Sequence, residues 1–328
     1  MRRKAGGGPA KLRGPIAATR HAPARPRRRQ APLALFRTAL ALALVAVVAL
    51  ATPRLIDAWR QPASPSNSPA GAPTQVSVPG LESGACISFP PTHGRLNKTV
   101  FVDPGHGGLD PGVVGTTASG ATVQEKGATL AVAWRLAGLL RADGYVVVMA
   151  RTQDTTVVKL SDADSSLGAI TSRGVHRDLV ERAACANAAG ADALVSIHFD
   201  GFSDPTVGGT ETFYDPARPF AAANRRLATD LQFALVSRLG SPDRGVLTDD
   251  QLVAPTLTAS GQSYGHLIEL GPASAGWVDN PSRMPGALVE PLFVTNPSEA
   301  QLVADPAGQQ KLAAALEAGL VKYFSTSA

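Results

Sequence analysis

The sequence predicts an α/β fold, a single domain with a mostly parallel, twisted sheet flanked by helices. Short β-branched or apolar runs alternate along the chain with longer segments whose apolar residues recur at helical spacing. The run at 193–197 is apolar at almost every position, which is typical of a parallel strand covered on both faces. Ligands of such sheets bind beyond the carboxyl ends of the strands, so we expect a site, here a metal site, at that edge.

Strands are predicted where short apolar runs stop at turn residues. Thr99–Val102 is such a run, and Asp103-Pro104-Gly105 ends it. The same reasoning predicts strands at 145–149, 193–197, 267–268 and 287–289. Residues 155–176 form a long excursion rich in Ser and Asp, for which a lid or partner surface and a disordered loop remain alternatives.

The helices carry recognisable start and stop signals. Gly144, Gly190 and Gly240 each follow an apolar periodic segment and supply a C-terminal stop. Pro219 and Pro297 suit the first helical position, and Pro297 lies between an Asn cap and a Glu at the third position. These signals predict helices over 125–142, 178–189, 219–240 and 309–324, with a short helix starting at 296.

The formal net charge of +5 belongs to the first 37 residues rather than to the fold. These residues hold eleven Lys and Arg and no Asp or Glu. The rest of the chain has 20 basic and 26 acidic residues, a net charge of −6. An acidic body excludes nucleic acid as a partner.

An uncharged apolar run at 38–51 follows the basic segment and ends in Ala49-Leu50-Ala51. This order is typical of an export signal, so residues 1–51 predict export to an extracytoplasmic space, with cleavage near Ala51. The run is short of the ~20 apolar residues that span a membrane. A retained membrane tether through residues 33–51 remains the alternative.

Residues 52–96 are rich in Pro, Ser, Gly and Ala, a composition that predicts a linker. We therefore expect the folded domain to cover 97–328. No heptad array is present, so a monomer is the default expectation.

Two cysteines, Cys86 and Cys185, are the whole complement of the chain. In an exported protein an even number favours a disulfide, which here would close a loop of 99 residues. Two unpaired thiols remain the alternative.

Three chemically active side chains follow predicted strands, and a fourth begins a helix. His106, His198 and Glu290 come just after the strands at 99–102, 193–197 and 287–289, and Glu125 opens the helix that follows the His106 loop. All four are expected at the same edge of the sheet. Two imidazoles and one carboxylate form the ligand set of many catalytic zinc sites.

Several motifs occur in a fixed order over about 99–325. They are Val102-Asp103-Pro104-Gly105-His106-Gly107-Gly108-Leu109-Asp110-Pro111-Gly112, Glu125, Glu181-Arg182-Ala183-Ala184-Cys185-Ala186-Asn187, Ser196-Ile197-His198, Arg244-Gly245-Val246, Met284-Pro285, Leu288-Val289-Glu290, Phe293 and Asn296-Pro297. In this order they resemble the zinc-dependent N-acetylmuramoyl-L-alanine amidases of the amidase-3 type.

The resemblance implies a peptidoglycan hydrolase that cleaves the amide between N-acetylmuramic acid and the L-alanine of the stem peptide. It implies His106, Glu125 and His198 as ligands of Zn²⁺ and Glu290 as the catalytic carboxylate, with peptidoglycan or muropeptide fragments as partners. Zinc lowers the pKa of its water to ~7 and polarises the carbonyl, while Glu290 would act as general base and then acid.

Three further details concern residues close to this set. Asp103 is close enough in sequence to orient the His106 ring, although Asp-Pro-Gly is also an ordinary turn. Glu269-Leu270-Gly271 imitates the catalytic tripeptide and makes Glu269 the rival of Glu290, which we prefer because the flanking motifs match. Asp200 and Pro291 depart from the family pattern and put substrate preference or full activity in question.

The sequence leaves two alternatives to an active amidase. One is an impaired, amidase-like protein that binds wall fragments or a regulator. The other is a zinc peptidase that cleaves within the stem peptide.

Overall fold

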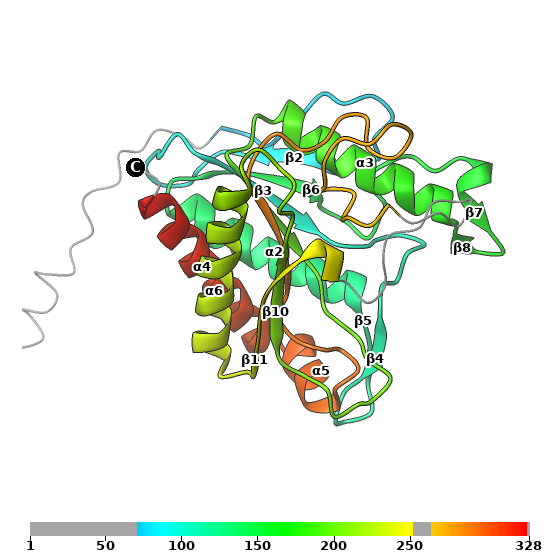
Figure 1. Cartoon of the computed structure of the whole chain (residues 1–328), viewed down its shortest axis with the longest axis vertical. Coiled ribbons are helices and arrows are strands. Elements are labelled where there is room, and N and C mark those ends of the chain that lie inside the picture. Colours follow the sequence, from blue (N-terminus) through cyan, green and yellow to red (C-terminus); the bar gives the residue numbers. More distant parts are fainter. Residues whose placement is uncertain (1–70, 252–263, 327–328) are drawn as a thin grey trace, which may run out of the picture. The chain divides into compact units, whose positions relative to one another are not determined.

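The computed structural model describes residues 71–251 and 264–326, all within the second of two units into which the chain divides, 65–328. Eight strands form one sheet in the order β1-β2-β6-β3-β9-β12-β10-β11 (Figure 1). They are β1 (Thr74–Gln75), β2 (Ala85–Phe89), β3 (Thr99–Pro104), β6 (Val146–Arg151), β9 (Ala193–Ile197), β10 (Thr210–Tyr214), β11 (Asp243–Thr248) and β12 (Gly286–Glu290).

The central strands β6, β3, β9 and β12 are parallel, and antiparallel neighbours lie on both sides of them. On one side, β2 pairs antiparallel with β6. On the other, β10 runs antiparallel to β12 and parallel to β11. The carboxyl ends of β10 and β11 therefore lie at the edge opposite to those of β3, β9 and β12.

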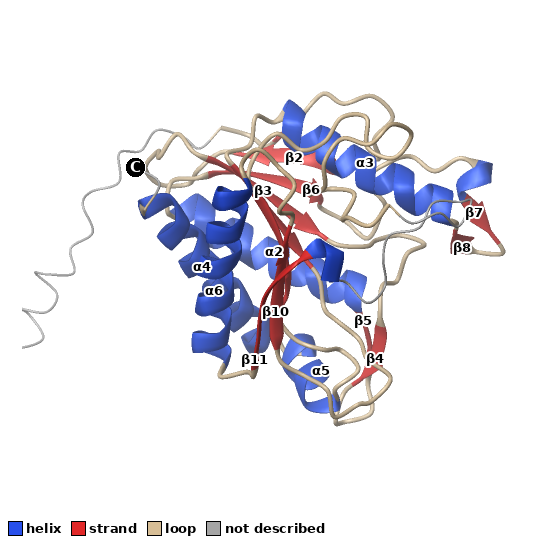
Figure 2. Cartoon of the chain, in the orientation of Figure 1, coloured by secondary structure: helices blue, strands red, loops and turns tan. Residues whose placement is uncertain are grey.

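Helices cover both faces of the sheet, as the apolar run at 193–197 predicts (Figure 2). Val100 and Val102 pack on one face with α2 (Glu125–Ala142), α4 (Ala221–Leu239) and α6 (Pro306–Ser325). Phe101 and Leu194 point to the other face, where they pack with residues of α3 (Ser172–Ala188). Because side chains alternate along a strand, each strand contributes to two cores.

The remaining elements are short and lie around the sheet. They are the hairpins β4 (Val114–Thr116) with β5 (Thr122–Gln124) and β7 (Ser165–Ser166) with β8 (Ala169–Ile170), the 3₁₀ turns η1 (Asp162–Asp164) and η2 (Asp249–Gln251), and α5 (Pro297–Ala304). The excursion at 155–176 is thus ordered: it holds η1, the β7–β8 hairpin and the first turn of α3.

One domain boundary and one strand were predicted wrongly. The folded part begins before residue 97, because β2 pairs with β6 and Ala85 and Cys86 are fully buried, so 52–96 is not a linker to its end. Residues 267–268 form no strand; the backbone turns there, with Gly271 N donating to Leu267 O at 2.7 Å. Composition missed β2 because its alternation is short and follows a Pro- and Ser-rich stretch.

The strands β10 and β11 were not anticipated from the sequence. Thr210–Tyr214 is half polar, and Asp243–Thr248 begins with a charged pair, so neither has the apolar pattern of a buried strand. Three of the long helices, α2, α4 and α6, begin and end within three residues of the predicted positions, and Gly240 takes the left-handed cap position with φ of +70°. The helix predicted over 178–189 begins six residues earlier than expected, at Ser172, where Thr171 caps it.

The cysteines form a disulfide, which confirms the pairing favoured by their even number. Cys86 in β2 is joined to Cys185 in α3, and both are fully buried. The bond attaches the early strand β2 to the helix that covers the same face of the sheet.

The predicted export signal at 1–51, its tether alternative and the first part of the linker lie outside the described residues. Among the helices of the described ranges, none has the length and apolar character needed to cross a membrane.

Candidate metal and catalytic site

Three side chains from separate elements meet beyond the carboxyl ends of β3 and β9. His106 follows β3, Glu125 is the first residue of α2, and His198 follows β9. His106 Nε2 and His198 Nδ1 each lie 3.0 Å from Glu125 Oε1 and 3.1 Å from one another. The structure thus brings together the three residues that the sequence placed at this edge.

The spacing of these three atoms fits a small divalent cation. Bonds of 2.0–2.1 Å to a tetrahedral zinc ion place neighbouring ligand atoms about 3.3 Å apart. The observed 3.0–3.1 Å triangle needs only a slight expansion to accept such an ion. The donor set, two imidazole nitrogens and one carboxylate oxygen, suits Zn²⁺.

The backbone around His106 is shaped to bring the ligands together. His106 itself has φ of +63°, a left-handed conformation that is uncommon for a residue with a side chain and is often found at functional sites. A Cβ on Gly105 would lie 2.3 Å from the His198 ring, and one on Gly112 would lie 2.5 Å from Glu125 Oε2. These two glycines leave room for the ligands, a role that the sequence motif alone did not reveal.

Asp110, rather than Asp103, orients the His106 ring. Asp110 Oδ2 lies 2.8 Å from His106 Nδ1, the nitrogen that faces away from the cluster. Asp103 instead accepts hydrogen bonds from Arg182 and from Ser196 Oγ, so the expectation for Asp103 is wrong. A carboxylate on the second ring nitrogen fixes the tautomer and leaves Nε2 free to bind a metal.

Arg182 in α3 supports the loop from beneath. Its guanidinium is buried and donates to Asp103 and Asp178, and also to the backbone oxygens of Pro104 and His106. The carbonyl contacts hold the turn in which His106 takes its left-handed conformation. The motif at 181–187 contains this residue, but its sequence position gave no sign of the contact.

The charges of His106 and Glu125 stabilise one another. Burial disfavours the charged imidazole of His106, yet the hydrogen bonds that the ring donates to Asp110 and Glu125 outweigh this effect and raise the pKa of His106 to about 9. Burial likewise disfavours a charged Glu125, but the two imidazoles hold the pKa of Glu125 well below its usual range. Glu125 also accepts from the backbone N–H groups of Val113 and Phe199 at 2.8 and 2.9 Å.

Glu290 ends β12 beside this cluster and lies among other acidic side chains. Burial, followed by the charges of Glu125, Asp200 and Glu211, raises the pKa of Glu290 well above its usual range. Glu290 Oε2 is buried and has no hydrogen-bond partner among the described residues. A free carboxylate oxygen beside a metal-ligand cluster has the character of a general base.

Glu211 was not expected at this site from the sequence, whereas Asp200 was expected near His198 as a departure from the family pattern. Glu211 pairs across the sheet with Glu290, and Arg244 Nε lies 2.6 Å from its carboxylate. Burial and a hydrogen bond with Glu211 raise the pKa of Asp200 to about 7. Both partners of Glu211 named here, Arg244 and Glu290, belong to recognised motifs, but Glu211 itself does not.

Pro291 is accommodated by a local irregularity of the sheet. His198 N donates to Val289 O, and Asp200 N donates to Leu292 O. Between these two hydrogen bonds the chain advances two residues on the β9 side but three residues on the β12 side. This extra residue, of the kind seen in a β-bulge, falls at Glu290 and Pro291 and removes the need for an N–H at Pro291. The departure from the family pattern therefore leaves the pairing of β9 and β12 intact beyond it.

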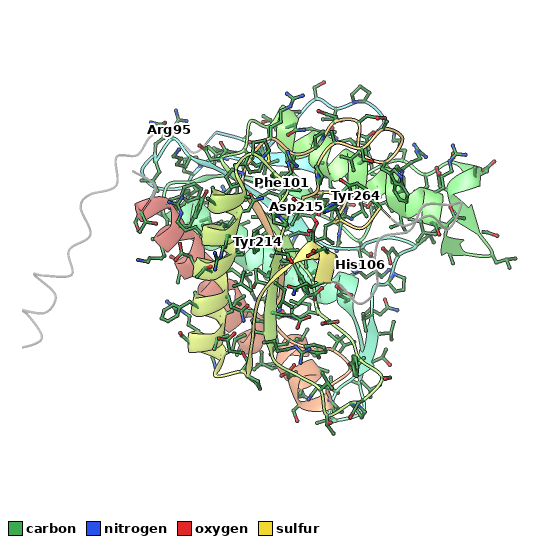
Figure 3. All side chains as sticks on the ribbon, in the orientation of Figure 1. Arg95, Phe101, His106, Tyr214, Asp215 and Tyr264 are labelled. Atoms are coloured by element: carbon green, nitrogen blue, oxygen red, sulfur yellow. A yellow bond between two sulfur atoms is a disulfide. The ribbon has the colours of Figure 1, made fainter. Side chains whose placement is uncertain are left out.

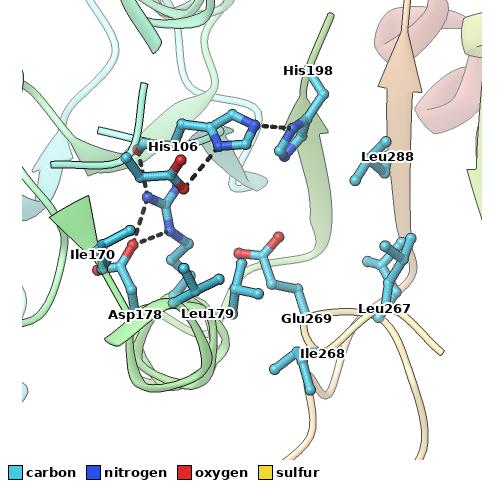
Figure 4. Close-up of a pocket in the computed structure, with 13 residues that line it drawn as sticks. His106, Ile170, Asp178, Leu179, His198, Leu267, Ile268, Glu269 and Leu288 are labelled. Atoms are coloured by element: carbon cyan, nitrogen blue, oxygen red, sulfur yellow. Dashed lines mark hydrogen bonds and ion pairs between the residues drawn. The ribbon is translucent and has the colours of Figure 1, made fainter. Parts of the chain in front are cut away.

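A pocket of about 130 Å³ opens next to the two histidines (Figure 4). Its walls come from α3, β12 and the turn at 267–270; they are His106, Asp110, Ile170, Val175, Asp178, Leu179, Arg182, His198, Leu267, Ile268, Glu269, Leu270 and Leu288. Glu269, the rival catalytic candidate, therefore lies in this wall and not in a strand. Burial, followed by the charge of Asp103, raises its pKa well above the usual range.

The chain was compared with known proteins. A family model described as N-acetylmuramoyl-L-alanine amidase matches residues 100–322, more than half of the chain. The chain is 31% identical over 229 residues to the N-acetylmuramoyl-L-alanine amidase LytC of Bacillus subtilis (strain 168), which covers 70% of this chain but only 36% of LytC. The chain thus spans about a third of that relative's length.

Two solved structures are similar to this fold. An N-acetylmuramoyl-L-alanine amidase from Clostridium difficile 630 is 29% identical with a TM-score of 0.51, covering 70% of this chain and 98% of that one. The CwlD amidase of Clostridioides difficile, solved in complex with the GerS lipoprotein, is 25% identical with a TM-score of 0.54, covering 70% and 100%. Together with the family match, these likenesses show that the chain belongs to the N-acetylmuramoyl-L-alanine amidase family.

Proposed function

We propose that this protein is a zinc-dependent peptidoglycan amidase that cleaves the bond between N-acetylmuramic acid and the L-alanine of the stem peptide. The observation that carries the proposal is the triangle of His106 Nε2, Glu125 Oε1 and His198 Nδ1 beside the unpartnered Glu290 Oε2. Membership of the amidase family supplies the bond that such a site would cleave.

His106, Glu125 and His198 would hold the zinc ion. When bound, the ion would polarise the scissile carbonyl and acidify a water molecule. Asp110 keeps the His106 ring in the tautomer that presents Nε2, and the backbone bonds from Val113 and Phe199 keep Glu125 in place. These hydrogen bonds would thus preorganise the ligand side chains for metal binding.

Glu290 would move the protons of the reaction. Its free oxygen would accept a proton from the attacking water and later deliver it to the departing amine of L-alanine. The raised pKa of Glu290 suits the second step, and the positive charge of a cation at the neighbouring cluster would oppose the rise and favour the ionised base. The predicted export signal at 1–51 would bring the enzyme to its polymer outside the cytoplasm.

Digestion of purified sacculi with Glu290→Gln and Glu269→Gln variants tests the proposal. The wild type should release stem peptides with a free N-terminal L-alanine, and a chelator should stop the release. Loss of a general base typically costs 10²–10⁴-fold in rate, so we expect at least a roughly 100-fold loss for Glu290→Gln with unchanged zinc content.

The Glu269→Gln variant is the matched control, because Glu269 is a buried glutamate of the adjoining pocket wall. It should keep activity within several-fold of the wild type. Cleavage within the stem peptide would support a peptidase instead. Binding to sacculi by the zinc-loaded wild type without any cleavage would support a non-catalytic role for the fold.

A further inference from the structure

A second cluster of metal-ligating side chains lies at the opposite edge of the sheet. Asp215 directly follows β10, Asp249 directly follows β11, and His266 comes from the turn that begins after residue 263. Because β10 and β11 are parallel, their carboxyl ends place both aspartates at one edge. Asp215 and Tyr264 are labelled in Figure 3, and the Tyr264 ring lies 5.3 Å from that of His266.

The distances within this cluster suit a shared ion. His266 Nδ1 lies 2.9 Å from Asp215 Oδ2 and 3.3 Å from Asp249 Oδ2. Asp215 is fully buried and Asp249 almost so, while His266 is partly exposed. The cluster is thus open to solvent only on the imidazole side.

One oxygen of the cluster lacks a hydrogen bond. Asp215 Oδ1 accepts from Ala217 N at 2.6 Å, whereas Asp215 Oδ2 is buried and receives no aligned donor. Its contact with His266 Nδ1 is an ion-pair distance without hydrogen-bond geometry. Buried carboxylate oxygens without partners are costly, and a bound cation is one way to satisfy them.

Within the described part of the chain, the neighbouring Arg218 does not take that place. Arg218 donates its hydrogen bonds to the backbone oxygens of Leu270, Gly271 and Ser282 and to the Ser282 hydroxyl. Among the described residues, the two carboxylates therefore share one imidazole as their neighbouring cationic group, and a single positive charge would balance only one of the two negative charges.

We propose that Asp215, Asp249 and His266 form a second binding site for a divalent cation of the first transition row, such as Zn²⁺ or Mn²⁺. An imidazole ligand favours these ions over Ca²⁺ and Mg²⁺, which prefer oxygen ligands alone. The ion binds one nitrogen and two carboxylate oxygens and leaves further positions for water on the exposed side. This proposal does not depend on the proposed amidase activity.

The position of this ion gives it a structural role near the other cluster. Asp249 Oδ2 accepts from Leu267 N at 3.0 Å, and Leu267 and Glu269 belong to the pocket wall beside His106 and His198. A cation at the second cluster attaches the 264–271 turn to the ends of β10 and β11. It therefore stiffens one wall of the pocket from behind.

Metal analysis of the full chain, dialysed after loading with Zn²⁺ or with Mn²⁺, tests the site. The wild type should retain two equivalents, and Asp215→Asn should retain one. Glu125→Gln, which removes a ligand of the other cluster, should also retain one, and the double variant should retain none. Asp250→Asn is the matched control, since exposed Asp250 adjoins Asp249 outside the cluster; it should retain two.

Thermal unfolding supplies a second readout. An ion that binds only the folded state raises the melting temperature. Zinc should raise the melting temperature of Glu125→Gln but not of Glu125→Gln combined with Asp215→Asn. If Asp215→Asn fails to fold, His266→Gln gives the same count and the same comparison.

These measurements distinguish failure of the second-site proposal from failure of the proposed zinc site at His106. Retention of one equivalent that Glu125→Gln abolishes and Asp215→Asn leaves untouched would overturn the second site. It would mean that His266 alone holds the two carboxylates. One equivalent lost in Asp215→Asn and kept in Glu125→Gln would support the second site and count against zinc at His106.

Discussion

The two clusters differ less in their ligand atoms than in what surrounds those atoms. At His106, a left-handed backbone, a carboxylate on the second ring nitrogen and a buried arginine all hold the ligands in place. At His266, the ring contacts two aspartates at the ends of unanticipated strands, and its Nε2 has no hydrogen bond among the described residues. The first cluster is thus prepared for precise chemistry, and the second is suited to fastening a turn.

Removal of Arg182 should have the largest effect on this contrast. Arg182→Met leaves the buried carboxylates of Asp103 and Asp178 without their cation, and breaking a buried pair in this way typically costs about 3–5 kcal/mol. The His106 turn also loses a support at its backbone oxygen. Denaturant unfolding should show the loss of stability, and metal analysis should show weaker binding at the first cluster alone.

Arg177→Met is the control on the same helix. Arg177 also pairs with an aspartate, Asp164, but it is about one-third exposed, and Arg173 pairs with the same carboxylate. Because the Arg177 guanidinium is partly exposed and Arg173 still neutralises the buried Asp164 carboxylate, the loss should be small, about 1 kcal/mol. Equal losses in the two variants would show that burial of Arg182 adds nothing.

The sequence predicts the first cluster well and the second not at all, for a physical reason. His106, Glu125 and His198 follow or begin elements with strong apolar periodicity, and the rule for parallel strand ends then places them together. Asp215 and Asp249 directly follow strands that lack the apolar pattern of a buried strand. These strands were not predicted, so the rule for parallel strand ends could not be applied to the two aspartates.

Contacts that depend on tertiary structure escaped prediction in both regions. Asp103 lies three residues from His106, yet the turn directs Asp110 to the ring and Asp103 to Arg182. The strand β2 was hidden in a linker-like composition, although its cysteine pairing was anticipated. Local sequence fixes an element, but the direction of a side chain in a glycine-rich turn depends on the backbone angles that the whole fold imposes.

Asp110→Asn should have the next largest effect and should act only on the first cluster. The amide binds the His106 ring less strongly, so the ring loses basicity and fixed orientation, and loss of such a partner typically lowers metal affinity 10–100-fold. Competition with a chelator measures the affinity. Asp154→Asn is the control. Asp154 accepts a hydrogen bond from Gly108 N in the His106 loop but does not touch the His106 ring, so the metal affinity of this variant should change little. An equal drop in both would assign the effect to the loop rather than to the ring.

The smallest expected effect is a pH dependence at the second cluster. Burial, together with the neighbouring carboxylate of Asp215, raises the pKa of Asp249 to about 6, against the opposing hydrogen bond from Leu267 N and the charge of His266. A raised pKa in the folded state adds stability below the usual pKa of 3.8, and this contribution is lost as the pH rises through about 6. In chelator, Asp249→Asn should therefore gain stability relative to the wild type as the pH rises from about 4 to above 6.

Zinc at pH 7 should reverse that order, because the wild type keeps a ligand that Asp249→Asn has lost. Melting temperatures across the pH range, with Asp250→Asn as the control that shows a flat difference, measure both parts. A difference between Asp249→Asn and the wild type that does not vary with pH would mean that Asp249 is already ionised beside Asp215 in the metal-free fold. The second cluster would then resemble the first, because His266 would stabilise its negative charge. The contrast between a cluster preorganised for catalysis and one that attaches the 264–271 turn would disappear.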